Sequence, residues 1–122
     1  MKKILIIEDD EFLQGLEATK IKNSGYEVIT ALNGEDGMKR ISDSKIDLVL
    51  LDLLLPNYDG FQILKKIREG ELNKDIPVIV FSNLSEKSDI NKANELGATK
   101  FMIKSNFSLE ELVEYINKIL IK

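Results

Sequence analysis

The sequence contains neither cysteine nor histidine, and these two absences exclude several kinds of chemistry at once. Without cysteine there is no disulfide framework, no thiolate zinc site and no thiol nucleophile. Without histidine there is no serine–histidine relay, no imidazole metal ligand and no histidine phosphocarrier. Polar chemistry is therefore confined to carboxylates, hydroxyls, amides, lysine and arginine.

Turn-forming residues are few, and no long apolar run is present. The 122 residues include 7 glycines and 2 prolines, with 43% hydrophobic and 31% charged residues, which is typical of one folded domain over residues 1–122. The apolar run Ile4–Ile7 is too short for a signal peptide or a membrane span, so we expect a cytoplasmic protein without membrane contact. A net charge of -4 argues against direct nucleic-acid binding by this chain.

Short apolar runs alternate with longer amphipathic segments along the chain. Strands with nearly continuous apolar character are typical of a parallel sheet that is buried on both faces. The pattern therefore predicts an α/β, doubly wound domain built from five βα repeats with helices on both faces. The predicted strands are 2–7, 26–31, 46–52, 77–82 and 99–104, and the predicted helices are 11–24, 34–43, 60–69, 86–96 and 108–121.

The stretch Leu48–Gly60, LVLLDLLLPNYDG, places one carboxylate, Asp52, inside an aliphatic run. An ionised carboxylate that is removed from water is costly unless something pairs with it, so Asp52 needs a partner. In open parallel sheets, ligands bind beyond the carboxyl ends of the strands. Polar residues stand at four such ends: Glu8, Asp9 and Asp10 after the first predicted strand, then Asp52, Ser82 and Lys104.

These residue types suit phosphoryl transfer assisted by a divalent cation. Mg²⁺ takes oxygen ligands, and Glu8, Asp9 and Asp52 could supply them. Closely spaced carboxylates stay ionised only beside a compensating charge, which a metal and Lys104 would provide. Asp52 would then be the nucleophile, with Lys104 and Ser82 stabilising the phosphoryl oxygens.

Taken in order, these features resemble the receiver domains of two-component response regulators, of the CheY-like kind. Ser82 follows Asp52 by 30 residues and Lys104 follows it by 52, separations close to those of the family. The resemblance covers essentially the whole chain. The residues that carry it are Glu8 and Asp9, the segment Asp52, Pro56, Asp59 and Gly60, and then Ser82 and Lys104.

The resemblance implies a flavodoxin-like fold with strand order 2-1-3-4-5 and a phosphorylation-dependent switch in a two-component (phosphorelay) system. Asp52 corresponds to the phosphoacceptor, which takes its phosphoryl group from a sensor histidine kinase, a phosphotransfer protein or small phosphodonors. Asp9 corresponds to the direct Mg²⁺ ligand, with Glu8 assisting. The Leu54 backbone carbonyl would complete the protein ligands, and Mn²⁺ is an alternative ion.

The resemblance also implies a switch and an output. Ser82 corresponds to the hydroxyl that turns toward the phosphoryl group, Lys104 to the cation that bonds it, and Phe101 to an aromatic whose rotamer follows the hydroxyl. A changed surface would control an effector protein or an attached output domain, or form a phosphorylation-dependent homodimer. The implied catalysis is limited to the chain's own phosphorylation and dephosphorylation. That surface comprises the predicted segments 86–96, 99–104 and 108–121.

Four departures from the commonest family pattern stand out. The acidic pair begins with Glu8 where aspartate is usual, and Asn83 follows the switch serine where a small residue is common. Ser105 replaces the usual proline after the lysine, so we expect a trans peptide there. Leu54 and Leu84 occupy positions that tune the access of water, and two apolar residues there predict slow loss of the phosphoryl group.

Other interpretations remain open at this stage. Asn83 and Ser105 favour a receiver-fold interaction module that acts without phosphorylation. A flavin-binding protein would need a phosphate-binding loop where this chain has an acidic run after its first strand. A haloacid-type phosphatase would need an aspartate where Leu54 stands. Elsewhere, the basic residues Lys65, Lys66 and Arg68 are expected to form a solvated helix face.

Several individual residues also have simpler interpretations. Asp9 or Asp10 could cap the next helix, and Asp59 and Gly60 are expected to form a turn before a helix whichever function holds. Phe101 could be an ordinary core aromatic. The sequence names neither the kinase nor the output, and it leaves open whether the chain is free-standing or part of a longer protein.

Overall fold

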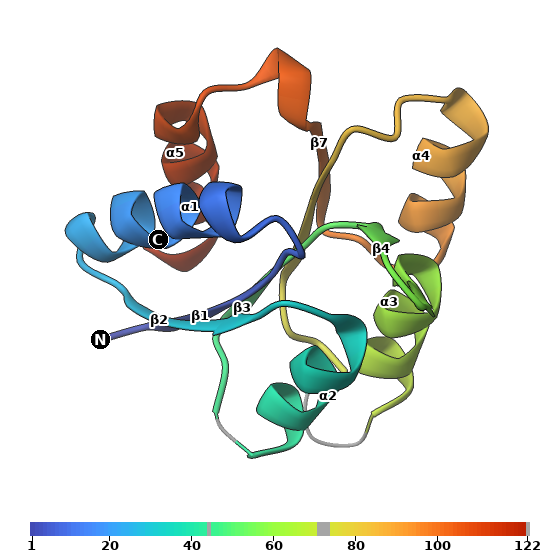
Figure 1. Cartoon of the computed structure of the whole chain (residues 1–122), viewed down its shortest axis with the longest axis horizontal. Helices are drawn as coiled ribbons and strands as arrows, with labels where there is room; N and C mark the ends of the chain where they lie inside the picture. Colours follow the sequence, from blue (N-terminus) through green and yellow to red (C-terminus); the bar gives the residue numbers. More distant parts are fainter. Residues whose placement is uncertain (44, 71–73, 122) are drawn as a thin grey trace.

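The computed structural model describes residues 1–43, 45–70 and 74–121. Five parallel strands form a sheet in the order β2-β1-β3-β6-β7 (Figure 1), which is the predicted order when the parallel strands are counted along the chain. The prediction of a doubly wound α/β domain is therefore confirmed. The strands are β1 Lys3–Ile7, β2 Glu27–Ala31, β3 Leu48–Leu51, β6 Val78–Ser82 and β7 Lys100–Ile103.

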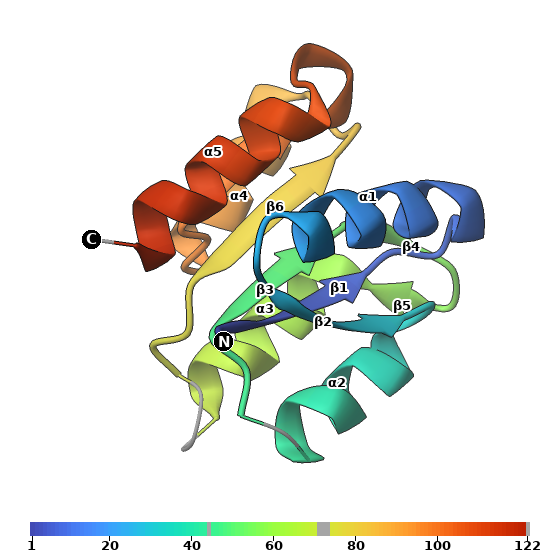
Figure 2. The same ribbon diagram turned by 90° about the vertical axis from the view of Figure 1, so that its left-hand side faces the viewer.

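The helices cover both faces of this sheet. Helices α1 and α5 lie together on one face, and α2, α3 and α4 lie on the other (Figures 1 and 2). None of the described helices combines the length and the apolar character that a membrane span requires. The helices are α1 Glu11–Asn23, α2 Gly34–Asp43, α3 Gly60–Glu69, α4 Lys87–Glu95 and α5 Leu109–Leu120.

Two apolar cores result from the alternation of side chains along the strands. Leu5 and Ile7 of β1 point into the core on the α2–α3–α4 side, whereas Ile4 and Ile6 point into the core on the α1–α5 side. All four are fully buried, as expected for a strand covered on both faces. The helical contributions include Ile63, Leu64, Ile67 and Ala93 to the first core and Ile21, Leu112 and Ile116 to the second.

Local signals in the sequence account for most helix starts. Ser108 and Glu111 form a capping box at the start of α5, with each side chain accepting a backbone N–H of the other residue. Asp10 caps α1 by accepting from the Leu13 N–H, so the helix-capping interpretation holds for Asp10. Asp59 caps α3 through the Phe61 N–H, which agrees with its expected structural role.

The structure also contains a short hairpin that the pattern did not predict. Strands β4 Leu54–Leu55 and β5 Tyr58–Asp59 pair antiparallel directly after Asp52. Pro56 and Asn57 connect them, and Asn57 has a φ of 57°, a left-handed conformation that asparagine adopts more readily than most residues. This hairpin brings the chain from the end of β3 to the start of α3 in a tight, fixed path.

The predicted strands and three of the predicted helices are one to three residues shorter in the structure, and one surface assignment was wrong. β3 ends at Leu51, one residue before Asp52, and Lys104 begins a 3₁₀ turn, η1 Lys104–Asn106, instead of ending β7. Arg68 was expected on a solvated face, and this was wrong. Its guanidinium donates to the carbonyls of Lys74, Ile76 and Gly97, at 2.6–3.1 Å, so it ties α3 to the chain around β6 and β7.

Candidate functional site

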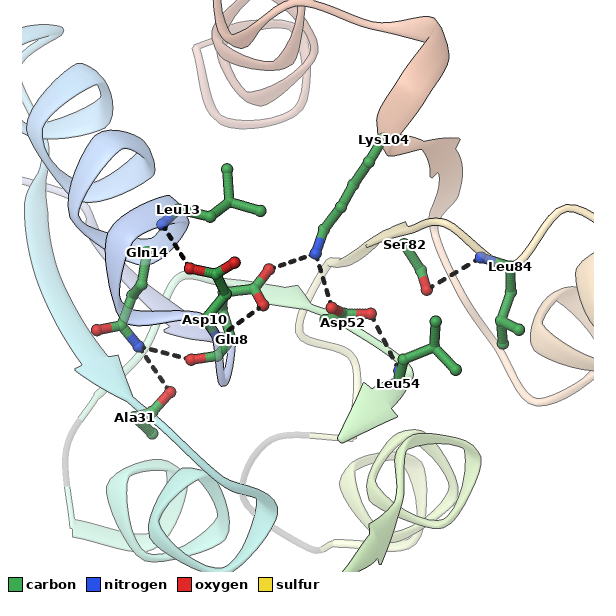
Figure 3. Close-up of polar contacts among 10 residues, drawn as sticks. All are labelled: Glu8, Asp10, Leu13, Gln14, Ala31, Asp52, Leu54, Ser82, Leu84 and Lys104. Atoms are coloured by element: carbon green, nitrogen blue, oxygen red, sulfur yellow. Dashed lines mark hydrogen bonds and ion pairs between the residues drawn. The ribbon is translucent and has the colours of Figure 1, made fainter. Parts of the chain in front are cut away.

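The parallel register brings the polar strand ends to one edge of the sheet. Ile7 of β1 pairs with Leu51 of β3, so the residues that follow them, Glu8 and Asp52, emerge side by side. The Asp52 N–H continues this ladder by donating to the Ile7 carbonyl at 3.0 Å. Lys104 arrives from the end of β7, and its side chain points toward both carboxylates (Figure 3).

Lys104 links the two buried acids. Its ammonium lies 2.5 Å from Glu8 Oε1 and 2.7 Å from Asp52 Oδ2. Glu8 is only 2% exposed and Asp52 only 5% exposed, so neither carboxylate could remain ionised cheaply without this cation. The partner that the sequence required for Asp52 is therefore present in the structure.

The electrostatics of this cluster reflect a balance between burial and pairing. Burial raises the pKa of Glu8, and the hydrogen bond from Lys104 opposes that rise. Burial lowers the pKa of Lys104, but its hydrogen bonds to Asp52 and Glu8 outweigh this effect, so the pKa of Lys104 is raised overall. The two acids therefore favour the protonated, positively charged form of Lys104.

Backbone groups hold the remaining carboxylate oxygens. Leu54 donates its N–H to Asp52 Oδ1 at 3.0 Å, and Asp10 donates its N–H to Glu8 Oε2 at 3.2 Å. Each acid thus has one oxygen on Lys104 and the other on the main chain. Rotation of either carboxylate would break at least one of these bonds, so both groups are oriented before any ligand arrives.

Asp9 differs from its two neighbours because it is exposed. Carboxylate oxygens of Glu8, Asp9 and Asp52 lie within 4.8 Å of one another, a spacing that could hold a metal ion. All three offer hard oxygen ligands, which suit Mg²⁺ or Mn²⁺. Asp9 also lines a cavity of about 360 Å³, together with residues 32–35 and 56–58. The donor set therefore fits a hard divalent cation.

Of the predicted switch and tuning residues, Leu54 contacts the cluster directly, through its N–H bond to Asp52. Ser82 ends β6 fully buried, and its Oγ accepts from the Leu84 N–H at 3.4 Å. Leu54 is 52% exposed and Leu84 is partly buried, while Asn83 is exposed. Phe101 is partly buried and packs against the α2–α3–α4 core.

Sequence reasoning missed two buried polar residues on α1. Gln14 donates its side-chain amide to the carbonyls of Glu8, at 3.0 Å, and Ala31, at 2.8 Å. Glu17 is 1% exposed, and neither of its carboxyl oxygens has a hydrogen-bond partner among the described residues. With Ala18 and Ile21 these residues follow the i, i+3, i+4, i+7 spacing of one helix face, and that spacing could have revealed them.

Glu17 lies close enough to the acidic cluster to be affected by its charge. Burial raises the pKa of Glu17 to about 8, and the nearby charge of Glu8 adds to the rise. An acid in such surroundings keeps its proton at neutral pH. Glu17 therefore contributes a neutral carboxyl group to the core rather than a fourth negative charge to the site.

Comparison with known proteins identifies the family. The model of the response regulator receiver domain matches residues 4–117. The chain belongs to this family. The predicted membership is thus confirmed. None of the described peptide bonds is cis, which agrees with the trans Lys104–Ser105 bond expected where serine replaces the usual proline.

Relatives of known role and structure support the assignment. The receiver domain is 36% identical to the alkaline phosphatase synthesis transcriptional regulatory protein PhoP of Bacillus subtilis over 119 residues, which cover 98% of this chain and 48% of that protein. The chain spans about half the length of the curated relatives it matches.

Solved structures give the same picture. The response regulator TrrA of Thermotoga maritima, in complex with Mg²⁺ and BeF, is 32% identical with a TM-score of 0.86, and the match covers 98% of this chain and 100% of TrrA. The Mn²⁺-bound response regulator Rcp1 is 27% identical with a TM-score of 0.86, covering 100% of this chain and 97% of Rcp1.

Proposed function

We propose that this receiver domain, acting as one unit over residues 1–122 in the cytoplasm, is a switch that accepts a phosphoryl group on Asp52. The observation that carries the proposal is the Lys104 ammonium held between Glu8 and Asp52, with the exposed Asp9 carboxylate beside them. This arrangement pairs a carboxylate nucleophile with a cation and places that cation where phosphoryl oxygens would arrive. The donor would be a sensor histidine kinase, a phosphotransfer protein or a small phosphodonor.

The proposed reaction is an in-line displacement at phosphorus. An oxygen of Asp52 forms the new P–O bond while the bond from phosphorus to the donor's nitrogen or oxygen breaks, and that donor atom keeps the electron pair. The Leu54 N–H and the Lys104 ammonium orient the Asp52 carboxylate before the attack. Lys104 can then exchange its bond to Asp52 for a phosphoryl oxygen, which keeps its charge paired throughout.

The proposed metal is Mg²⁺, with Mn²⁺ as an alternative. Asp9 and Asp52 would bind it, Glu8 would assist, and the Leu54 carbonyl would complete the protein ligands. When bound, the ion would neutralise charge on the carboxylates and on the phosphoryl oxygens. The donor set supports this choice, as do the Mg²⁺ and Mn²⁺ complexes of TrrA and Rcp1.

The proposed output is a changed surface on α4, β7 and α5. Ser82 would turn from the Leu84 N–H toward the phosphoryl group, and Phe101 would change rotamer in response. A partner that prefers the altered surface would shift the equilibrium between the two states. That partner would be an effector protein, an attached output domain or a second copy of this domain.

The decisive experiment measures the covalent adduct. With Mg²⁺ and acetyl phosphate, the intact mass should rise by one phosphoryl group, and Asp52→Asn should abolish the rise. Asp9→Asn should weaken Mg²⁺ affinity severalfold or more, because it removes a charged ligand. Asp75→Asn, which changes an exposed acid at the opposite end of the sheet, should alter neither result. Absence of an adduct with acetyl phosphate, and of a complex with beryllofluoride, would contradict the switch and favour an interaction module that acts without phosphorylation.

The two apolar residues beside the site predict a long-lived phosphoryl group. Leu54 and Leu84 offer no polar atom in their side chains to orient a hydrolytic water, so we expect slow dephosphorylation. Leu84→Glu should speed the loss of the adduct by about tenfold or more, because a carboxylate there can position water. The decay of the phosphorylated mass with time measures both rates, and Leu84→Met is the matched apolar control. A wild-type lifetime of only seconds would show that these leucines do not slow hydrolysis.

A further inference from the structure

The inward face of α1 carries an amide that reaches the acidic loop. Gln14 is 9% exposed, and its side-chain nitrogen donates to two main-chain carbonyls, those of Glu8 and Ala31. These residues come directly after β1 and at the end of β2. Gln14 thus joins the helix to the point where the ladder between the two strands stops (Figure 3).

The Glu8 carbonyl is the more informative of the two acceptors. It belongs to the peptide group that joins Glu8 to Asp9, and peptide groups are planar. A bond that fixes the direction of this carbonyl therefore fixes the plane from which the Asp9 backbone continues. The Ala31 carbonyl has a second donor, the Glu8 N–H at 3.1 Å, whereas Gln14 is the donor that the described structure gives to the Glu8 carbonyl.

Asp9 needs such support because none of the described residues forms a hydrogen bond or ion pair with its side chain. Its side chain is exposed, and it lies between the end of β1 and Asp10, the cap of α1. In contrast, the side chain of Glu8 accepts hydrogen bonds from the Lys104 ammonium and from the Asp10 N–H. The orientation of Asp9 therefore depends on the main chain that leads to it.

We propose that Gln14 is a positioning residue for the metal site: its amide fixes the Glu8–Asp9 peptide and so aims the Asp9 carboxylate at the ion. This inference rests on the proposed function, because it assigns Gln14 a part in loading that same site. A residue that orients a metal ligand without touching the metal typically contributes ten- to a hundredfold in affinity.

Replacement by leucine tests the inference because leucine has a similar volume and no donor. In Gln14→Leu the Glu8 carbonyl loses its donor, so the peptide is free to rotate and the Asp9 carboxylate samples more directions. We expect the Mg²⁺ dissociation constant, measured by calorimetry on the full chain, to rise by about tenfold or more. At saturating Mg²⁺, phosphorylation by acetyl phosphate should recover toward the wild-type rate, whereas Asp52→Asn should not recover at any concentration.

The control separates positioning from general loss of stability. Ile21 lies on the same face of α1 and is fully buried, but it stands about two turns beyond Gln14, farther from the acidic loop. Ile21→Val and Ile21→Ala provide a series that brackets the stability lost in Gln14→Leu, as measured by urea unfolding. The inference requires unchanged Mg²⁺ affinity in this series. An equal loss of affinity in an Ile21 variant of matched stability would overturn it.

A measurement on the wild-type protein without metal completes the test. If Gln14 holds the two carbonyls, its side-chain amide protons should exchange slowly with water, and in Gln14→Leu the amide signals of Asp9 and Asp10 should shift or broaden. Fast exchange of the Gln14 protons, or an unchanged Mg²⁺ affinity in Gln14→Leu, would refute the inference. Failure of the wild-type protein to bind Mg²⁺ would instead count against the proposed function itself.

Discussion

Two regions of the molecule bury carboxyl groups, and they treat the resulting charge differently. At the carboxyl edge of the sheet, Glu8 and Asp52 share the ammonium of Lys104 and have backbone N–H groups on their other oxygens. On the inward face of α1, Glu17 is equally buried but its oxygens have no partner among the described residues. Both regions belong to one small domain.

The difference teaches what a buried acid needs in order to act as a nucleophile. Pairing with an ammonium favours the ionised form of a carboxylate, whose lone pairs are then available to a phosphorus atom. An unpaired one keeps a proton instead, because burial raises its pKa, here to about 8 for Glu17. The pairing by Lys104, and not burial or acidity alone, therefore distinguishes the candidate site from an acid in the core.

Removal of the cation should produce the largest effect. In Lys104→Met, two buried carboxylates lose their common partner, so the free energy of unfolding at neutral pH should fall by about 4 kcal/mol. The loss should shrink as the pH is lowered, because protonation of the acids removes their repulsion. Urea unfolding at several pH values measures both results. Added Mg²⁺ should restore part of the lost stability, since the ion supplies the missing positive charge.

An exposed ion pair provides the control for Lys104. Lys39 lies 4.0 Å from Glu35 on the surface of α2, and both side chains are more than two thirds exposed. Lys39→Met should change the free energy of unfolding by less than about 0.5 kcal/mol. Equal effects of the two substitutions would show that Lys104 contributes no more than a surface charge, and the contrast between paired and unpaired buried acids would fail.

Much of the sheet-edge region was predictable from the sequence because each part has its own local signal. Strands that are apolar throughout, followed by Asp52, Ser82 and Lys104, indicate both the parallel sheet and the edge where polar residues meet. Parallel pairing in register then brings Glu8 beside Asp52, which lies 44 positions later in the chain. The short hairpin after Asp52 and the 3₁₀ turn that begins at Lys104 were not predicted, because segments of two or three residues are too short to show a period.

The buried polar groups were harder to predict because their roles depend on tertiary contacts. Arg68 was predicted to be solvated. Its guanidinium instead donates to the carbonyl of Gly97, 29 residues away, and no residue near Arg68 in the sequence indicates this contact. Gln14 and Glu17 lie at inward positions of α1, but a polar residue at such a position is usually taken as evidence against burial. The helical period puts both residues on the inward face of α1. Only the packed structure shows that Gln14 bonds two carbonyls there and that Glu17 has no partner among the described residues.

The second-largest expected effect is the dependence of stability on pH that the unpaired Glu17 causes. The ordinary pKa of a glutamate is 4.5, which the unfolded chain should show, whereas Glu17 in the folded protein has a pKa of about 8. Between these values the folded state binds more protons than the unfolded state, so stability falls as the pH rises through this window. Each pH unit costs about 1.4 kcal/mol, which amounts to about 3 kcal/mol between pH 5.5 and 7.5.

Glu17→Leu should remove this cost. Relative to wild type, the variant should gain stability steadily from pH 5 to pH 8, with little further change above that range. Glu17→Gln is the matched control, because it removes the titration but keeps an unpartnered polar group in the core. Its stability relative to Glu17→Leu should therefore not vary with pH. A difference between wild type and Glu17→Leu that is the same at pH 5 and pH 8 would mean that Glu17 does not hold a proton in the folded state.

The smallest effect distinguishes the backbone beneath the site from the outer face of α1. A Cβ at Gly60 would lie 2.4 Å from the Cα of Leu53, the residue after Asp52, so Gly60→Ala must displace main chain next to the nucleophile. We expect a loss of about 2 kcal/mol and a weaker Mg²⁺ affinity. A Cβ at Gly15 would meet nothing within 4 Å, so Gly15→Ala should raise stability by about 1 kcal/mol through helix propensity and leave Mg²⁺ affinity unchanged. If both glycines tolerated alanine equally, the close approach of α3 to Leu53 would not constrain Asp52, and the fixed geometry of the paired acids would have to come from their hydrogen bonds alone.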